Sequence, residues 1–446
     1  MKVATAGLLL GLATLAATTP ASAQLLGAPL PPLGGLPDLP ERLERPVERT
    51  LSRLEDPAEG LLASSRGLGA ATLADVRRLT VARLLREHPR FVEADDAGQP
   101  VARGEVLALA PAPEALARIE AAGFRVARRS DLEGLGLEAV VLNPPKGVSA
   151  REAMRRLKAI DPEGAYEFNH LFQASGEARA SGARSPSPAA GPMAAAGVRL
   201  GLVDGSAAAN HPALRRAKVT QRAFAPGGAR VTDHATAVAS LMVGAAGPFR
   251  GAAPGADLYV ADVYGTTPAG GSAEAIARGL AWLAQNRVPV VNISLVGPRN
   301  RLLEQAVAAL NARGVVVVAA VGNDGPAAPP LYPAAYPGVV AVTAVNGRRQ
   351  ALPEAGRGAH VDFAAPGADM AGAAARGGYL AVRGTSFAAP LVAGLIARQG
   401  GRIEGLAATD LGTAGPDPVY GRGLVAFDLR TEPVRVGARA LALRSP

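Results

Sequence analysis

The chain of 446 residues contains 53 glycines, 37 prolines and 48% hydrophobic residues, so it can bury a large core and hold two or three domains. It has no cysteine, which excludes cysteine nucleophiles and cysteine-based zinc sites, and no His-Glu-x-x-His pair, which argues against a metallopeptidase. The net charge is +9, but the arginines are scattered, with no dense basic run and no aromatic platform beside them. We therefore expect no nucleic-acid partner, and a basic surface that favours anionic surfaces or acidic substrates.

The first 23 residues have the pattern of a secretory signal peptide. A basic start at Lys2 is followed by an apolar stretch over residues 8–17 and by the small residues 21–23, which resemble a cleavage site. The apolar run before Pro20 is too short for a membrane anchor, and no later segment is long and apolar enough to span a bilayer. We expect export to the periplasm or secretion from a bacterial cell, and no transmembrane segment in the mature chain.

Residues 24–100 combine a linker with helical segments. Residues 24–40 are too rich in proline and glycine for regular structure. A charged helix is predicted near residues 40–55 and a second helix over residues 73–87, for which Thr72 and Asp75 suit a capping pair. The sequence assigns no function to this part of the chain.

Residues 101–173 predict a small α+β unit. The expected elements are a strand at 105–110, a helix at 113–122, strands at 124–129 and 137–143, a helix at 150–160 and a strand at 166–172. This β-α-β-β-α-β order is that of a ferredoxin-like fold. The following residues 174–196 are rich in alanine, glycine, serine and proline and predict a flexible linker.

Residues 197–430 predict an α/β domain. Apolar strands are expected at 198–204, 257–264, 288–295, 314–321 and 339–345, with helical stretches between them. Continuous apolar runs suit parallel strands that are covered on both faces, so we expect a three-layer sandwich with a mostly parallel sheet. Residues 431–446 are interpreted as a C-terminal tail.

Ser386 stands where a glycine-led turn at Gly384 enters an apolar helix. Free N–H groups and the positive end of the helix dipole favour negative charge at that point, so a serine there suits a nucleophile, although serine is also a common helix cap. A serine hydroxyl needs a base, usually a histidine oriented by a carboxylate. His234, at a predicted helix start, and Asp204, at a strand end, are the candidates, while a helix cap and a turn are their structural alternatives.

The three residues occur in the order Asp, His, Ser, and six ordered segments resemble the subtilisin-like serine peptidase (subtilase) family. The matching segments are residues 203–205 with 211–214, 234–239, 251–256, 291–295, 321–325 and 384–390. The resemblance covers roughly residues 197–430. It implies a serine endopeptidase acting on peptide or protein substrates through an acyl-enzyme.

The resemblance also implies residue roles. Asp204, His234 and Ser386 would form the catalytic triad, and the Asn323 side chain would join the Ser386 N–H in an oxyanion hole. The expected substrate-binding residues are Ser294, Leu295, Val296 and Gly297. No cofactor is required; calcium sites are frequent in the family, but this chain has no recognisable acidic loop for one.

Standing before such a domain, residues 101–173 look like the family's propeptide, which assists folding and then blocks the site. The proenzyme would be processed by its own activity, with the cut within residues 174–196 or close to them, and the propeptide would be a partner of the enzyme.

Three positions depart from the family pattern. Ser206 carries a hydroxyl one position later than usual, which predicts a looser Asp204, and Ala235 replaces a glycine that a helix start does not need. Val296 replaces a groove glycine and is predicted to narrow a subsite. These departures motivate an alternative, a catalytically silent subtilase fold used as a binding or chaperone module of the cell envelope. A third hypothesis, a basic envelope-binding structural protein, depends on charge alone.

Overall fold

The computed structural model describes residues 70–180 and 195–438. The predicted signal peptide, the linker and the charged helix near residues 40–55 lie outside the described residues. The second predicted helix is α3, Ala70–Glu87. Because it begins at Ala70, Thr72 lies inside the helix, and its predicted role as the cap is wrong.

The N-terminal α+β unit has the predicted element order. Its antiparallel sheet contains β1 (Val92–Ala94), β2 (Pro100–Leu109), β4 (Leu137–Asn143) and β3 (Arg125–Leu132) in that order, with β5 (Ala165–His170) beside β2. The helices α4 (Pro113–Ala121) and α5 (Ala150–Ile160) share one apolar cluster with the sheet, in which Val106, Ile119 and Leu157 are fully buried. β2 begins five residues before the predicted strand.

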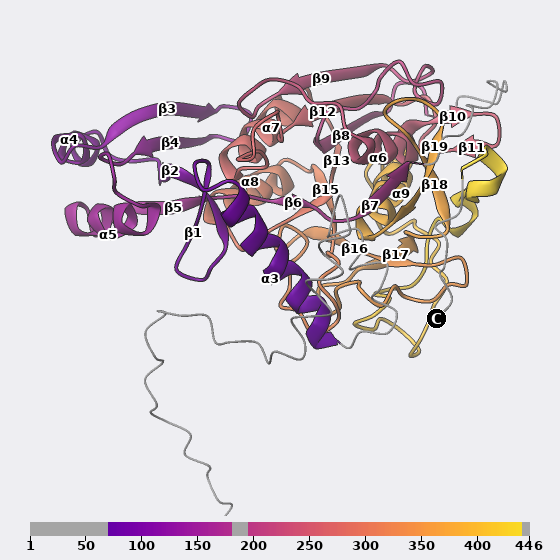
Figure 1. The fold of residues 1–446 in the computed structure, drawn as a ribbon. Coiled ribbons are helices and arrows are strands. Elements are labelled where there is room, and N and C mark those ends of the chain that lie inside the picture. Colours follow the sequence, from indigo (N-terminus) through magenta and orange to yellow (C-terminus); the bar gives the residue numbers. More distant parts are fainter. Residues whose placement is uncertain (1–69, 181–194, 439–446) are drawn as a thin grey trace, which may run out of the picture. The chain divides into compact units, whose positions relative to one another are not determined.

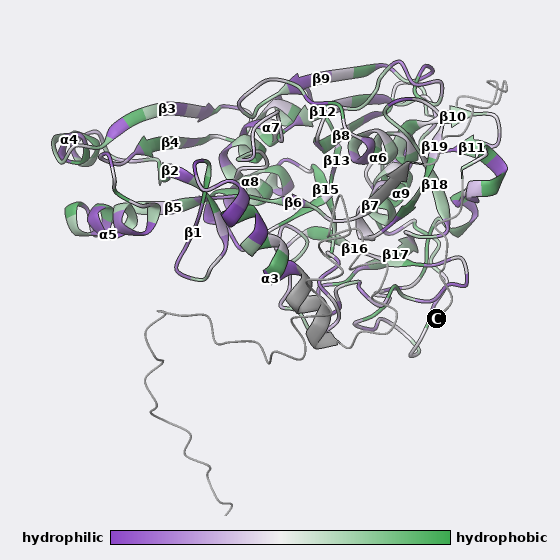
Figure 2. Ribbon diagram, in the orientation of Figure 1, coloured by the Kyte–Doolittle hydropathy of each residue, from purple (hydrophilic) through white to green (hydrophobic). Residues whose placement is uncertain are grey.

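The α/β domain is built on seven parallel strands within the described residues (Figure 1). Their order is β17 (Phe363–Pro366), β16 (Val339–Val345), β15 (Val316–Ala320), β13 (Val290–Ile293), β8 (Arg199–Asp204), β12 (Asp257–Asp262) and β9 (Val219–Ala223). The central strands are coloured as hydrophobic in Figure 2, in contrast to β3, which is largely hydrophilic. This agrees with central strands that are covered on both faces.

Two helix layers cover this sheet. One face carries α6 (Asp233–Val243) and α9 (Thr385–Arg398), and the other carries α7 (Ala273–Gln285) and α8 (Arg301–Ala312). Neighbouring residues of one strand pack into opposite layers, as Leu202 does with α6 and α9 and Val203 with α7 and α8. The predicted three-layer α/β sandwich is confirmed.

The segment predicted as a flexible linker begins as two short strands. β6 (Gln173–Ala174) pairs antiparallel with β14 (Leu295–Val296), and β7 (Glu177–Ala180) pairs antiparallel with β19 (Tyr379–Arg383), which also pairs with β18 (Met370–Ala373). Main-chain pairing with edge strands fixes these residues, and their composition carries no sign of it.

The predicted tail also starts as packed structure. Thr431 accepts a hydrogen bond from the Ala371 N–H, and Val436 in the short 3₁₀ helix Pro433–Val436 is buried. In the part of the chain that the structure describes, no helix has the length and apolarity needed to cross a membrane.

Candidate active site

The buried Asp204 and the half-buried His234 form a hydrogen-bonded pair. Asp204 is the last residue of β8 and is 1% exposed, and His234 is the second residue of α6. The His234 Nδ1–H donates to Asp204 Oδ2 at 2.8 Å, which fixes the tautomer and directs Nε2 away from the carboxylate. Within residues 70–180 and 195–438, the buried Nε2 has no hydrogen-bond partner. It is therefore available to accept a proton.

Thr232 positions this histidine by capping α6. Its Oγ1 accepts a hydrogen bond from the Ala235 N–H at 3.0 Å, so the chain enters the helix at a fixed angle just before His234. Ala235 is fully buried without disturbing this cap. The replacement of glycine there is tolerated, as the sequence predicts.

Ser386 is the second residue of α9, directly after the glycine turn. Gly384 has φ of 135°, and a Cβ atom on it would lie 2.7 Å from Gly176 Cα and 2.9 Å from Asn323 Nδ2. A side chain at Gly384 would thus be strained and would collide with both neighbours. The Ser386 carbonyl accepts a hydrogen bond from Ser294 Oγ at 2.9 Å, which anchors the start of the helix to the sheet.

Asn323 lies beside Ser386, three residues after β15. Its Oδ1 accepts the Thr385 N–H at 3.1 Å. Because the oxygen of the amide is engaged there, the Nδ2 atom faces Gly384. A Cβ atom on Gly384 would lie 2.9 Å from Asn323 Nδ2 and 3.1 Å from the Ser175 carbonyl oxygen, so both atoms border the same small space. An amide donor therefore stands next to a peptide carbonyl.

A segment of the chain itself occupies the position in front of Ser386. The Ser386 N–H donates to the Ser175 carbonyl oxygen at 3.0 Å, and Ser386 Oγ also contacts that oxygen. The Ser175 and Ser386 hydroxyl oxygens are 2.9 Å apart. Ser386 Oγ is thus engaged with Ser175, and no hydrogen bond joins it to His234.

The four predicted substrate-binding residues line the same segment. The Ser294 carbonyl accepts the Ser175 N–H at 3.4 Å, Leu295 pairs with Ala174, and Val296 pairs with Gln173. Gly297 lies against Phe172, because a Cβ atom there would be 2.5 Å from the phenyl Cδ1. The predicted site residues are therefore brought together around one strand of the chain.

The hydroxyl of Ser206 does not bond to Asp204. It donates to Oδ2 of Asp262, at the end of the neighbouring strand β12, at 2.7 Å. Asp204 Oδ1 accepts the Gly205 N–H at 2.7 Å instead, so both of its oxygens have partners. The expectation of a loosely held Asp204 is wrong, because a main-chain donor replaces the hydroxyl.

Two aromatic residues of the site were missed by sequence reasoning. The ring of Phe387 is 5.2 Å from the His234 ring, and its place directly after Ser386 was the signal that could have found it. Tyr264 is half-buried, and its buried hydroxyl lies within reach of the charges of two carboxylates. Burial and then the charges of Asp204 and Asp262 raise its pKa well above the ordinary value, so its hydroxyl stays protonated.

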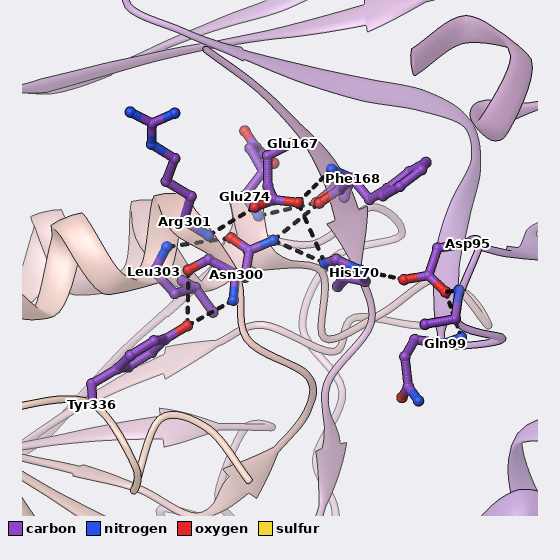
Figure 3. Close-up of polar contacts among 12 residues, drawn as sticks. Asp95, Gln99, Glu167, Phe168, His170, Glu274, Asn300, Arg301, Leu303 and Tyr336 are labelled. Atoms are coloured by element: carbon purple, nitrogen blue, oxygen red, sulfur yellow. Dashed lines mark hydrogen bonds and ion pairs between the residues drawn. The ribbon is translucent and has the colours of Figure 1, made fainter. Parts of the chain in front are cut away.

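A polar network joins the N-terminal unit to α8 (Figure 3). Asn300, the N-cap of α8, donates from Nδ2 to the Phe168 carbonyl and to His170 Nδ1, both at 3.0 Å, while its Oδ1 accepts the Leu303 N–H. The His170 Nε2–H donates to Asp95 Oδ2 at 3.0 Å. His170 is 4% exposed, so this contact is shielded from water.

A second contact centres on Glu274 of α7. This carboxylate is 2% exposed and accepts hydrogen bonds from Ser130 Oγ at 2.6 Å and from Arg128 Nε at 2.9 Å, both on β3. The Glu274 N–H donates to Asn169 Oδ1 at 3.1 Å. Sequence reasoning did not find this contact, because ordinary charged residues of distant segments make it.

Helix α3 reaches the neighbourhood of Asn323. Arg77 forms an ion pair of 3.1 Å with Asp324, whose pKa is raised because burial outweighs the effect of the arginine. Among the residues that the structure describes, no group of three or more histidine or acidic side chains is arranged to hold a metal ion.

A parallel α/β sheet with a hydrogen-bonded Asp–His pair, a serine at a helix start and a peptide strand across it defines the class as a serine peptidase. The family model "Subtilase family" matches residues 195–410. Subtilisin DY of Bacillus licheniformis is 34% identical over 247 residues, which cover 52% of this chain and 89% of the relative. Subtilisin Savinase of Lederbergia lenta is 35% identical over 211 residues, covering 46% and 77%.

The crystal structure of fervidolysin from Fervidobacterium pennivorans, described as a keratinolytic enzyme related to subtilisin, has the same fold. It superposes with a TM-score of 0.61 at 19% identity, over 76% of this chain and 62% of that one. The chain belongs to the subtilase family. It is a subtilisin-like serine endopeptidase.

Proposed function

We propose that the enzyme hydrolyses peptide bonds through a triad of Asp204, His234 and Ser386. Ser386 Oγ attacks the carbonyl carbon while its proton passes to His234 Nε2, and Asp204 stabilises the imidazolium. His234 then gives the proton to the leaving amine, which leaves an acyl-enzyme that water hydrolyses by the reverse route. The observation that carries this proposal is the 2.8 Å Asp204–His234 hydrogen bond, which leaves Nε2 free.

The developing oxyanion would be held by two donors, the Ser386 N–H and Asn323 Nδ2. The Ser386 N–H already donates to a peptide carbonyl at 3.0 Å, and the Asn323 amide is oriented by Thr385 so that its N–H groups are directed toward the same space. Preorganised donors of this kind cost no rearrangement at the moment of reaction.

The proposed biological form is an exported proenzyme that cuts itself. Residues 1–23 would direct export to the periplasm or outside the cell, and residues 101–173 would act as the inhibitory propeptide. The contacts of the N-terminal unit with α7 and α8, and the strand β6 on β14, support this role. The physiological substrates would be peptides or proteins that present an extended strand to the same edge.

Val296 would narrow the groove. It is 3% exposed, and a Cβ atom on Gly322 would lie 2.5 Å from Leu331 Cδ1 and 3.6 Å from Val296 Cγ1, so both side chains close the space next to Asn323. Val296→Gly is therefore expected to admit larger residues in a peptide library. An unchanged cleavage profile would contradict this role.

A fluorophosphonate probe tests the proposed chemistry. The processed protein should be labelled at Ser386 at neutral pH, and Ser386→Ala should lose both the labelling and the hydrolysis of casein. A folded protein that binds peptides but is neither labelled nor active would instead favour the silent binding module.

A further inference from the structure

We infer that the enzyme cuts itself between Ser175 and Gly176, and that Phe387 restricts the residue after the cut bond to glycine. The inference rests on the proposed serine-peptidase chemistry and adds the bond and the side chain that selects it. Ser175 is chosen by geometry, because its carbonyl oxygen receives the Ser386 N–H at 3.0 Å and also contacts Ser386 Oγ.

The chain is held by main-chain pairing on both sides of this bond. Before it, Gln173 and Ala174 pair with Val296 and Leu295; after it, residues 177–180 pair with β19 in the register Glu177 to Arg383. Two antiparallel ladders thus leave only Ser175 and Gly176 between them, and the Ser175 carbonyl that precedes the bond to Gly176 lies at the nucleophile. Main-chain pairing accepts many sequences, so selection of the residues at the cut must come from the side chains that surround this peptide bond.

Phe387 forms the wall on the leaving-group side. A Cβ atom on Gly176 would lie 2.7 Å from Phe387 Cε2, 3.1 Å from Ser386 Oγ and 3.2 Å from Phe387 Cδ2. The Phe387 ring is fully buried and lies 5.2 Å from the His234 ring, so moving it away would disturb the general base. Glycine is the residue that fits without such a movement.

The sequence contains a second possible cut site, because Ala-Ser-Gly occurs at residues 174–176 and again at residues 180–182. Phe172 distinguishes the two. It lies three residues before Ser175, is fully buried and packs against Gly297, whereas the corresponding residue before Ser181 is Ala178. A buried phenyl ring sets the register in favour of the first site.

The reaction is a balanced hydrolysis. Ser386 Oγ bonds to the carbonyl carbon of Ser175, the bond to the Gly176 nitrogen breaks, and the Ser386 proton reaches that nitrogen through His234 Nε2. Water then splits the ester and restores Ser386. The products are a Ser175 carboxylate and a chain that begins at Gly176.

N-terminal sequencing of the earliest product during refolding of the full chain tests the cut site. Wild type should begin at Gly176. Gly176→Ala should slow processing about 10- to 100-fold, the scale of inserting a methyl group into a packed site. Phe387→Leu should remove most of that penalty in the double variant, while Gly182→Ala, in the second Ala-Ser-Gly segment, should process at the wild-type rate.

The peptide Phe-Gln-Ala-Ser-Gly-Glu and its Ala-for-Gly counterpart test the selection on mature wild type, where no variant has to fold. A tenfold or larger preference for the glycine peptide is expected. A first cut at another bond, equal rates for the two peptides, or no recovery in the double variant would overturn the inference. Absence of fluorophosphonate labelling would instead overturn the proposed chemistry itself, so the two failures differ.

Discussion

The N-terminal unit meets the peptidase domain in two different ways. At Ser386, residues 173–176 are held mainly by main-chain hydrogen bonds, whereas at α7 and α8 the contacts are side-chain hydrogen bonds of Glu274 with Ser130 and of Asn300 with His170. Main-chain contacts of the first kind accept many sequences, and they lie at Ser386. The side-chain contacts of the second kind fit only this N-terminal unit, and they contain no peptide bond to be cut. Cutting and release are therefore expected to respond to different substitutions.

His234→Ala should have the largest effect, because it removes the base at the first contact. Processing and peptide hydrolysis should fall by about six orders of magnitude, the scale measured in subtilisin itself. Electrophoresis of the purified protein would show the uncut chain. His88→Ala, which changes the histidine that follows α3, is the control and should be processed normally. Normal processing of His234→Ala would contradict the assignment.

Asn323→Asp tests the proposed oxyanion donor at the same contact. The aspartate keeps an oxygen that accepts the Thr385 N–H but loses the Nδ2 donor, so helix α9 keeps its anchor while the oxyanion loses one hydrogen bond. The turnover number should fall by about two to three orders of magnitude, again the scale known from subtilisin. Measurement of kcat and KM separates the effects, and a change in KM alone would assign Asn323 to substrate binding.

Glu274→Ala acts on the second contact. It removes the acceptor of the Ser130 hydroxyl and leaves Arg128 with a longer ion pair of 3.8 Å to Glu105, so the cleaved N-terminal unit should dissociate about 10- to 100-fold faster, although cutting itself proceeds. Gel filtration at successive times after processing measures the release. Glu304→Ala on α8 is the matched control, because that carboxylate pairs with Arg299 of the same domain. Equal release from both variants would contradict a specific role for Glu274.

The smallest expected effect is that of Asp95 on the stability of the folded protein, and this effect depends on pH. Burial acts to raise its pKa, but hydrogen bonds from His170 and from the Gln99 and Ala97 N–H groups outweigh burial and lower it below the ordinary 3.8. The charged form is thus favoured by folding, so its stabilisation is present above pH 3.8 and is lost as the pH falls through the lower folded value.

The stabilisation by charged Asp95 is measured from the melting temperatures of the uncut Ser386→Ala protein and of the same protein that also carries Asp95→Asn. The difference between these two melting temperatures should be constant between about pH 5 and 6 and should shrink below about pH 4. A difference in melting temperature that grows as the pH falls would contradict stabilisation by the charged form of Asp95.

The sequence predicted the parallel domain well, because buried parallel strands are continuous apolar runs and because the site residues lie at strand ends and helix starts. It did not predict the two strands of residues 173–180, since their partners are edge strands far along the chain. Phe387 and Glu274 were also missed: each acts through neighbours that only folding brings close. The prediction of a loosely held Asp204 was wrong, because only the folded chain shows that the Gly205 N–H takes the place of the hydroxyl and that Ser206 reaches Asp262.

Self-processing by Ser386 is tested most directly by N-terminal sequencing of purified wild type beside Ser386→Ala. Wild type is expected to begin at Gly176, and the Ser386→Ala chain is expected to keep the residues that precede Gly176. The same N-terminus in both proteins, or a wild-type cut far from residues 170–200, would contradict self-processing by Ser386.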